Sequence, residues 1–436
     1  PGDWAHQSIK DLVKSRGCNV IVSDKSLTRF EAAAIVNSCL GNVAEVTNIE
    51  RSLIDEFSSE IALLRGRVDG IEARMNEFEA GSFSSTTTLD GKAVMAIGAI
   101  GDGSEIGESE KVTAAYVYQM NLNTSFTGDD NLYVRLKTGD GWGAKTDAGP
   151  FDDKPASYHI EAKDNGDVLK VDKIWYTFPI GDNFTGTVGP LIENYYMLAA
   201  TPSVYKPGVL KAFKLGGHGV AFGASTSVGV GLKFDPGNGF AASVTGNSQG
   251  GNDAAGFFTE EDKNKVNTQI AYTADNYHVS ATYSVQSGAW DSWHYYSTDA
   301  VAAAAVGNDA EGFALRAWWR PDETGTAVPS LSVGFDTIDF DKTPTGKAKD
   351  GSGYMVGLNW QDMFQADDRI GVAVGQPIKA DSDDVSTEGD PFMWEAYYSF
   401  RPNDSIEITP AVFGGKEQEK DGTEDIFGTV LTTTFK

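Results

Sequence analysis

Short segments in which hydrophobic and polar residues alternate follow one another from about Thr86 to the last residue. In segment 277–285 the odd-numbered residues are apolar or aromatic, whereas the even-numbered residues, His278 among them, are polar. Segments 369–375 and 392–400 repeat this division. Side chains of a β-strand point alternately to its two faces, and a wall between lipid and water needs one face of each kind. The pattern predicts an all-β transmembrane barrel.

About sixteen such segments can be counted, which is an even number, as antiparallel bacterial barrels require. They begin near residues 86, 111, 131, 168, 183, 220, 238, 266, 276, 311, 328, 351, 368, 391, 405 and 425. A soluble β-sandwich or propeller with aromatic core layers would also show apolar strand faces, so no single strand separates the two interpretations. The connections between the strands are more informative.

Short turns and long loops alternate along the predicted barrel, as in outer-membrane barrels. The turns are rich in residues that tolerate turn dihedral angles, at 128–130, 181–183, 235–238, 275–276, 321–324, 365–368 and 401–404. The eight longer connections lie around 102–110, 140–167, 193–219, 248–265, 287–310, 341–350, 377–390 and 414–424. Aromatic residues before the turns suggest an interfacial girdle: Trp175, Phe178, Phe234, Trp318, Trp319, Trp360, Phe364, Tyr398 and Phe400.

The formal net charge of −27 argues against a nucleic-acid partner, since a phosphate polymer would be repelled. No run of eighteen or more apolar residues occurs, so no transmembrane helix is expected. The sequence begins at Pro1 without Met or a signal peptide, and we expect it to be a processed or trimmed chain whose export must be inferred from the barrel.

The first 42 residues predict a small α-helical module with two apolar helix faces. Its two cysteines, Cys18 and Cys39, are the only ones in the chain. They are too few for a disulfide scaffold but suit one local bridge in an oxidising compartment. The alternative is a pair of buried free thiols between helices.

Two short motifs in this region resemble the S-layer homology module. They are Asp3-Trp4-Ala5 at the start and Leu27-Thr28-Arg29-Phe30-Glu31 at the second helix. The resemblance implies a periplasmic module in which Trp4, Thr28, Arg29 and Glu31 bind acidic groups of a peptidoglycan-linked polymer. An arginine at a helix start is a suitable carboxylate receptor. The alternative is that Thr28 and Glu31 form a capping box while Arg29 is solvated.

Residues 43–82 predict a coiled-coil stalk. Apolar residues from Ile61 to Phe78 follow heptad spacing, and Ile49, Leu53, Phe57 and Ile61 step by fours, which marks a stutter. The charges at the flanking e and g positions are opposite, as in a parallel coil. A single helix packed on the barrel is the alternative.

The order of parts is a helical module at 1–42, a stalk at 43–82 and a barrel at 83–436. This order resembles the cyanobacterial outer-membrane porins of the carbohydrate-selective (OprB-like) family. The resemblance implies an outer-membrane porin, surrounded by lipid and tethered to peptidoglycan, that passes small hydrophilic solutes or ions. Because the general porins are trimeric, it also implies a homotrimer.

A sixteen-strand barrel is wide enough for a water-filled channel. Alternation places Arg135, Lys137 and Arg316 in the lumen, together with Arg320, Glu395 and Glu407. For each charge, solvation of the lumen is the simplest alternative role. In porins the third long loop commonly narrows the channel, and here that loop is net positive, with Lys206, Lys211 and Lys214 against Glu193. We therefore expect a basic constriction that selects by charge and size.

An enzymatic function is not expected. The five histidines lack metal-ligand spacing, and no Gly-x-Ser-x-Gly elbow occurs. His278 and Ser280 share a strand face, but it is predicted to face the lumen, whereas a lipase needs its site turned to lipid. Acidic stretches such as 381–384 lack the spaced ligands of a calcium site, and we expect no cofactor or metal. Besides a diffusion porin, a structural tether with a narrow or plugged barrel remains open.

Overall fold

A computed structural model of the 436-residue chain shows two compact units, residues 1–85 and 86–436. The structure describes residues 3–18, 20, 27–40, 46–67, 86–102, 112–141, 159–161, 163–217, 221–222, 225–288, 290, 309–341, 350–380, 392–419 and 422–436.

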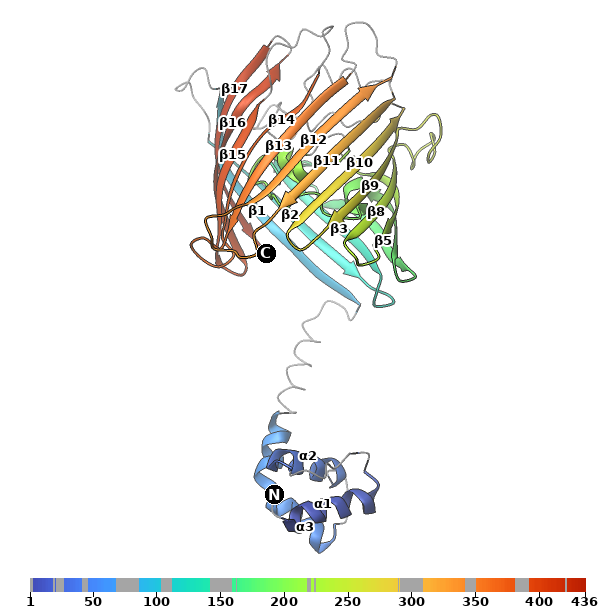
Figure 1. The fold of residues 1–436 in the computed structure, drawn as a ribbon, viewed down its shortest axis with the longest axis vertical. Helices are drawn as coiled ribbons and strands as arrows, with labels where there is room; N and C mark the ends of the chain where they lie inside the picture. Colours follow the sequence, from blue (N-terminus) through green and yellow to red (C-terminus); the bar gives the residue numbers. More distant parts are fainter. Residues whose placement is uncertain are drawn as a thin grey trace. The chain divides into compact units, whose positions relative to one another are not determined.

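The second unit is a closed antiparallel β-barrel (Figure 1). It has sixteen long strands, and the two-residue strand β4 pairs with the end of β3. The strands are β1 (Thr87–Asp102), β2 (Thr113–Thr124), β3 (Asn131–Gly141), β4 (Lys163–Asp164), β5 (Lys170–Ile180), β6 (Phe184–Ile192), β7 (Ser227–Phe234), β8 (Phe240–Ser248), β9 (Asn264–Thr273), β10 (Tyr277–Ser287), β11 (Ala310–Trp319), β12 (Ser330–Phe340), β13 (Asp350–Gln361), β14 (Arg369–Ala380), β15 (Met393–Asn403), β16 (Ile406–Glu419) and β17 (Gly422–Phe435).

Each long strand pairs with its neighbours along the chain, and β1 pairs with both β2 and β17, which closes the barrel. In the closing pair, Ala93 lies opposite Phe435. Closure gives every long strand of the described barrel a hydrogen-bonded neighbour on both sides, which is what a strand wall in lipid requires. The sixteen-strand barrel predicted from the alternation is confirmed, and fifteen of the sixteen predicted starts lie within three residues of the observed ones.

The alternation also gives the direction of the side chains. On β10, Tyr277, Val279 and Tyr283 are exposed on the outer wall, whereas His278 and Thr282 are buried on the inner wall. An apolar face turned outward and a polar face turned inward is the reverse of a soluble protein. This pattern fits an outer wall in lipid and an inner wall in a polar interior.

The predicted girdle is present on the turn side of the barrel, with two exceptions. Neighbouring rings on the outer wall contact each other in the pairs Tyr176–Phe178, Phe184–Phe234, Phe234–Phe240, Phe364–Tyr398 and Tyr398–Phe400. Trp175 and Trp318 do not belong to it. Trp175 stacks on the inward-facing Tyr133, and the Trp318 ring donates to the carbonyl oxygen of Thr201 inside the barrel. The prediction is wrong at these two positions because the residues beside them, Tyr176 and Trp319, are the ones that face outward.

Two predicted boundaries are wrong. The strand expected near residue 220 begins at Ser227, because Ala221 and Phe222 are fully buried inside the barrel as part of the third long loop. The long loop expected at 414–424 is not there, since β16 continues to Glu419 and pairs with β17 from Gly422 onward. Polar and glycine-rich residues in that segment resembled a loop but are compatible with strand pairing.

The first unit contains α1 (Asp3–Arg16), α2 (Arg29–Leu40) and α3 (Asn48–Glu56), and residues 58–67 are also helical. Its core extends beyond the predicted boundary at residue 42, because Leu53, Phe57 and Ile61 are buried against α1 and α2. These three residues belong to the core of the module rather than to the seam of a stalk. The remaining predicted seam residues, from Val68 to Phe78, lie outside the described residues.

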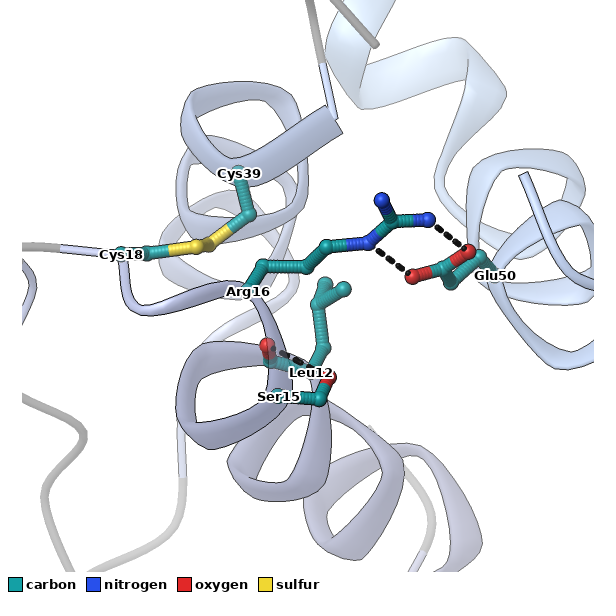
Figure 2. The surroundings of a disulfide bond; sticks show 6 residues. All are labelled: Leu12, Ser15, Arg16, Cys18, Cys39 and Glu50. Atoms are coloured by element: carbon teal, nitrogen blue, oxygen red, sulfur yellow. Dashed lines mark hydrogen bonds and ion pairs between the residues drawn. A yellow bond between two sulfur atoms is a disulfide. The ribbon is translucent and has the colours of Figure 1, made fainter. Parts of the chain in front are cut away.

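The predicted disulfide is confirmed. Cys18 follows α1 and Cys39 lies in α2, with their Cα atoms 5.6 Å apart (Figure 2). Beside it, Arg16 makes two hydrogen bonds of 2.8 Å to the carboxylate of Glu50 in α3. These hydrogen bonds hold the pKa of Glu50 at about 2. The bridge joins α1 to α2, and the ion pair joins α1 to α3.

Reduction of the disulfide is expected to destabilise the helical unit by about 3 kcal/mol, because the bond closes a loop of 21 residues in the unfolded chain. The barrel closes on itself within one chain, so its stability should not change. Thermal unfolding followed by circular dichroism at 222 nm, with and without reductant, measures the effect. If the reductant does not change the midpoint temperature of the helical transition, this expectation is wrong. A chain with Cys18→Ser and Cys39→Ser should unfold at the same temperature as the reduced protein.

The barrel interior as the candidate functional site

The third long loop lies inside the barrel against the inner wall. It contains two short 3-10 helices, η2 (Asn194–Met197) and η3 (Lys211–Gly216). Its backbone donates hydrogen bonds to polar side chains on β8, β12 and β13: Ala199 N to Ser243 Oγ at 3.1 Å, Val204 N to Ser332 Oγ at 3.2 Å and Lys206 N to Asn359 Oδ1 at 3.2 Å. The inward polar faces of these three strands thus supply acceptors for a loop backbone that would otherwise lack them.

Glu395 on β15 is a fully buried anchor for this loop. Its carboxylate accepts hydrogen bonds from the hydroxyl of Tyr205 at 2.7 Å and from the backbone N–H groups of Gly208, Val209 and Leu210 at 3.1, 3.0 and 2.6 Å. Four donors on one carboxylate satisfy a charge that would be costly to bury without partners. The sequence predicted that Glu395 faces inward but did not predict its binding to the loop.

A second buried anchor is the ion pair between Arg316 on β11 and Asp336 on β12, with 2.7 Å between Nη2 and Oδ2. The guanidinium also donates to the carbonyl oxygens of Leu215, at 2.9 Å, and Gly217. At Gly334 a Cβ atom would lie 1.6 Å from a loop carbonyl oxygen, so only glycine allows this approach. Arg316 therefore faces inward as predicted, but it holds the loop and has no exposed charge.

Basic side chains gather on the wall formed by β1, β3 and β5. Arg135 and Lys163 both pair with Asp172, the latter at 2.8 Å. Lys173 pairs with Glu193 at 3.1 Å, and Lys92 pairs with Glu161 at 2.6 Å. We call the cationic side chains of this region the basic wall: Lys92, Arg135, Lys137, Lys163, Lys173, Lys211 and Lys214.

The three loop lysines that the sequence grouped together are divided between two places. Lys211 and Lys214 lie beside Glu193 and Lys173 in the basic wall. Lys206 instead has Arg369 and Glu407 as charged neighbours. It lines a cavity of about 500 Å³ together with Ser203, Asn359 and the turn residues 320–326. Loop spacing alone could not show this, because the segment between Lys206 and Lys211 is bound to Glu395 on the wall and separates their surroundings.

Four aromatic residues of the interior were missed as site residues. Tyr133 and Trp175 are opposite each other on β3 and β5, with ring centroids 4.2 Å apart. The Trp175 ring lies 4.8 Å from that of Tyr196, which lies 4.6 Å from that of Tyr195. We call these four rings the aromatic stack. The signal was available, since Tyr133 and Trp175 share the parity of Arg135 and Lys173, which face the lumen.

The residues of the helical unit that are candidates for binding the cell-wall polymer lie at the surface of that unit. Trp4 is half exposed. Thr28 and Glu31 form the capping box, with Glu31 N to Thr28 Oγ1 at 3.2 Å and Thr28 N to Glu31 Oε2 at 2.8 Å. The Arg29 guanidinium binds Glu60 at 2.6 Å and Glu56 at 2.8 Å, and its hydrogen bond to Glu60 holds the pKa of that carboxyl at about 2. Arg29 thus already binds two carboxylates of its own chain.

His278 Nε2 lies 2.9 Å from Ser280 Oγ, and the imidazole stacks on Trp318. Both residues are buried on the inner wall, as predicted, and so this pair is turned away from lipid. Within the described ranges, no group of three or more His, Cys, Asp or Glu residues could hold a metal ion.

Comparison with known proteins places this architecture. The family model described as carbohydrate-selective porin, OprB family, matches residues 51–421. The uncharacterized protein alr4550 of Nostoc sp. is 27% identical over 99% of this chain and 83% of its own length. The uncharacterized protein sll0772 of Synechocystis sp. is 30% identical over 43% of this chain and 39% of its own. The structure of Pseudomonas putida OprB matches with a TM-score of 0.57, 11% identity and coverage of 80% of this chain and 94% of that chain.

Proposed function

This chain belongs to the carbohydrate-selective porin, OprB family, and from that premise we propose that it forms a water-filled outer-membrane channel for passive diffusion of small hydrophilic solutes and ions. The observation that carries the proposal is the inverted barrel, apolar outside and polar inside, with a loop along its inner wall. Sixteen strands enclose more space than side chains can fill. The loop reduces that space to a passage that can discriminate by size.

The basic wall supports a preference for anions or for solutes with acceptor groups. Among the residues that the structure describes, its seven cationic side chains lie near three carboxylates, Asp172, Glu161 and Glu193. An excess of one charge along a narrow, low-dielectric passage raises the local concentration of the opposite ion. The family description suggests sugars as the solute class.

Single-channel recording in a planar bilayer tests the proposal. Purified protein should give stable conductance steps. In a salt gradient, the reversal potential should have the sign expected for a channel that prefers anions. Liposome swelling should be faster with small sugars than with large ones. Protein that inserts without conducting would contradict the proposal and would favour the second candidate function.

That second candidate is a mainly structural tether between the outer membrane and the cell wall. The buried anchors Glu395 and Arg316 favour this second function, since they hold the third long loop inside the barrel, where it narrows the channel. The same conductance measurement separates the two functions.

In either case we propose that the helical unit is a periplasmic module that binds a peptidoglycan-linked polymer through Trp4, Thr28, Arg29 and Glu31. The surface position of Arg29 supports the idea, because its guanidinium binds carboxylates, those of Glu56 and Glu60, and acidic groups of a polymer could take their place. We further propose a homotrimer, assembled through residues of the predicted stalk, which light scattering in detergent would test. Three weak modules on one assembly would bind with useful avidity.

Arg29→Ala is expected to reduce pull-down of the full chain with peptidoglycan sacculi by at least about tenfold, the loss expected for charge-assisted hydrogen bonds. Conductance should be unchanged, because the substitution lies outside the barrel. Arg51→Ala, an exposed arginine on α3, is the matched control and should bind as the unmodified chain does. If Arg29→Ala and the unmodified chain bound the sacculi equally, the motif would serve only as a capping box.

A further inference from the structure

The guanidinium of Arg29 has one glutamate on each of two edges. Along one edge, the carboxylate of Glu60 lies with Oε1 2.6 Å from Nε and Oε2 3.4 Å from Nη2. At the other edge, Glu56 accepts from Nη1 through its carboxylate Oε1 at 2.8 Å and from Nη2 through its backbone oxygen, also at 2.8 Å. The two glutamates therefore bind different nitrogens of the same arginine and need not have the same role.

Glu60 is the firmer of the two partners. Its side chain is 14% exposed, whereas that of Glu56 is 40% exposed. The Glu60 carboxylate also accepts a hydrogen bond from the Ser59 hydroxyl at 2.8 Å. Two hydrogen bonds along one edge of a guanidinium fix its orientation as well as its position. The buried ring of Phe57 supports the same orientation, because the guanidinium carbon lies over it, 5.2 Å from its centroid.

Glu56 is the partner that can be exchanged. Among the described residues, its carboxylate has Nη1 of Arg29 as its one hydrogen-bond donor, and the second N–H of Nη1 has no acceptor. An exposed ion pair of this kind is weak, because water and salt screen it. If the Glu56 side chain turned into water, its backbone oxygen would keep Nη2 in place. Nη1 would then be open to another acceptor.

The group that suits the open position is a carboxylate, the same group that Glu56 places there. We propose that Glu60 is a positioning residue that orients Arg29, and that Glu56 is an internal competitor that a carboxylate of the wall polymer displaces from Nη1. The inference rests on the proposed binding of a peptidoglycan-linked polymer and adds the side of Arg29 that receives it. It requires that removal of the two glutamates have opposite effects on binding.

Cosedimentation of the full chain with peptidoglycan sacculi measures these effects. Glu56→Ala is expected to bind about twofold to fivefold more tightly, the range for loss of an exposed competing ion pair. Glu60→Ala is expected to bind about twofold to tenfold more weakly, because the freed arginine must be ordered again on binding. Asp55→Ala is the matched control and should bind as the unmodified chain does. It removes an exposed carboxylate one position earlier in α3 that is not among the described partners of Arg29.

A second measurement follows Arg29 itself. Phenylglyoxal adds to the two Nη atoms of an accessible guanidinium, and mass spectrometry of peptides gives the rate at Arg29. That rate should rise about twofold to fivefold in Glu56→Ala, stay unchanged in Asp55→Ala and fall when sacculi are bound. Thermal unfolding followed by circular dichroism shows whether each helical unit has folded. Glu60→Asp, which keeps a carboxylate, should recover most of the binding that Glu60→Ala loses, and it keeps the test valid if the alanine variant does not fold.

Equal binding by Glu56→Ala and Asp55→Ala would overturn the role of Glu56 as a competitor. Binding by Glu60→Ala that matched or exceeded that of the unmodified chain would overturn the positioning role of Glu60. If neither the unmodified chain nor Glu56→Ala sedimented with sacculi, the proposed wall binding would itself be wrong and the inference would fall with it. The two failures are therefore distinguishable.

Discussion

Replacing Glu395 with alanine is expected to raise the single-channel conductance roughly twofold and to speed the entry of larger sugars into liposomes. The substitution removes the acceptor of four hydrogen bonds, three of them from the loop backbone at Gly208, Val209 and Leu210. Each hydrogen bond to a buried charge contributes about 1.5–3 kcal/mol, so the middle of the loop should detach from the wall. Conductance in 1 M salt measures the change in width apart from surface charge.

Glu407→Ala serves as its control. Glu407 is an inward-facing carboxylate on β16, ion-paired with Lys436 at 2.8 Å and Arg401 at 3.3 Å rather than bound to the loop backbone. Its loss should leave the width of the passage unchanged. If Glu395→Ala left conductance and sugar size exclusion as they were, the Arg316 anchor would be sufficient to hold the loop by itself.

Replacing Lys211 and Lys214 together with glutamine is expected to shift the reversal potential in a salt gradient toward cations, with roughly a twofold to fivefold fall in the anion-to-cation permeability ratio. Both side chains lie in the basic wall beside Glu193, which would keep its negative charge. The shift should be largest at low salt and weaken at 1 M, where the Debye length is about 3 Å.

Lys206→Gln is the comparison variant, since Lys206 lies apart from the basic wall, near Arg369 and Glu407. It should shift the reversal potential less than the double variant does. An unchanged reversal potential in the double variant at low salt would assign the selectivity to Arg135 and Lys137 on the barrel wall.

The barrel could be predicted from the sequence because its signal is local. Each strand has lipid on one side and a polar interior on the other, so the alternation within a single strand already reflects both environments. Strand β10, with Tyr277 outward and His278 inward, is an example. The tight turns are equally local, since they need residues that tolerate particular dihedral angles. The cysteines also paired as expected, because only two were available.

Predictions from local sequence patterns were wrong where the same residue type suits two different environments. Tryptophan suits both a lipid interface and a stacked lumen, and only the strand register shows that Trp175 lies opposite Tyr133. Leu53, Phe57 and Ile61 have helical spacing that fits both a stalk and a helical core, and their packing against α1 and α2 distinguishes the two. In each case the residue's partner is distant in the chain.

The sequence by itself determined the number of strands, the inward and outward faces of most strand residues and the tight turns, and it favoured the disulfide over free thiols. The tertiary structure decided the path of the third loop, because that path depends on contacts between residues nearly 200 positions apart, such as Leu210 and Glu395. It likewise separated Lys206 from Lys211 and Lys214, and it brought Arg29 to Glu56 and Glu60. The alternation of polar and apolar residues shows which side of the barrel wall a residue faces. The residues that it contacts on that side are determined only when the whole barrel has folded.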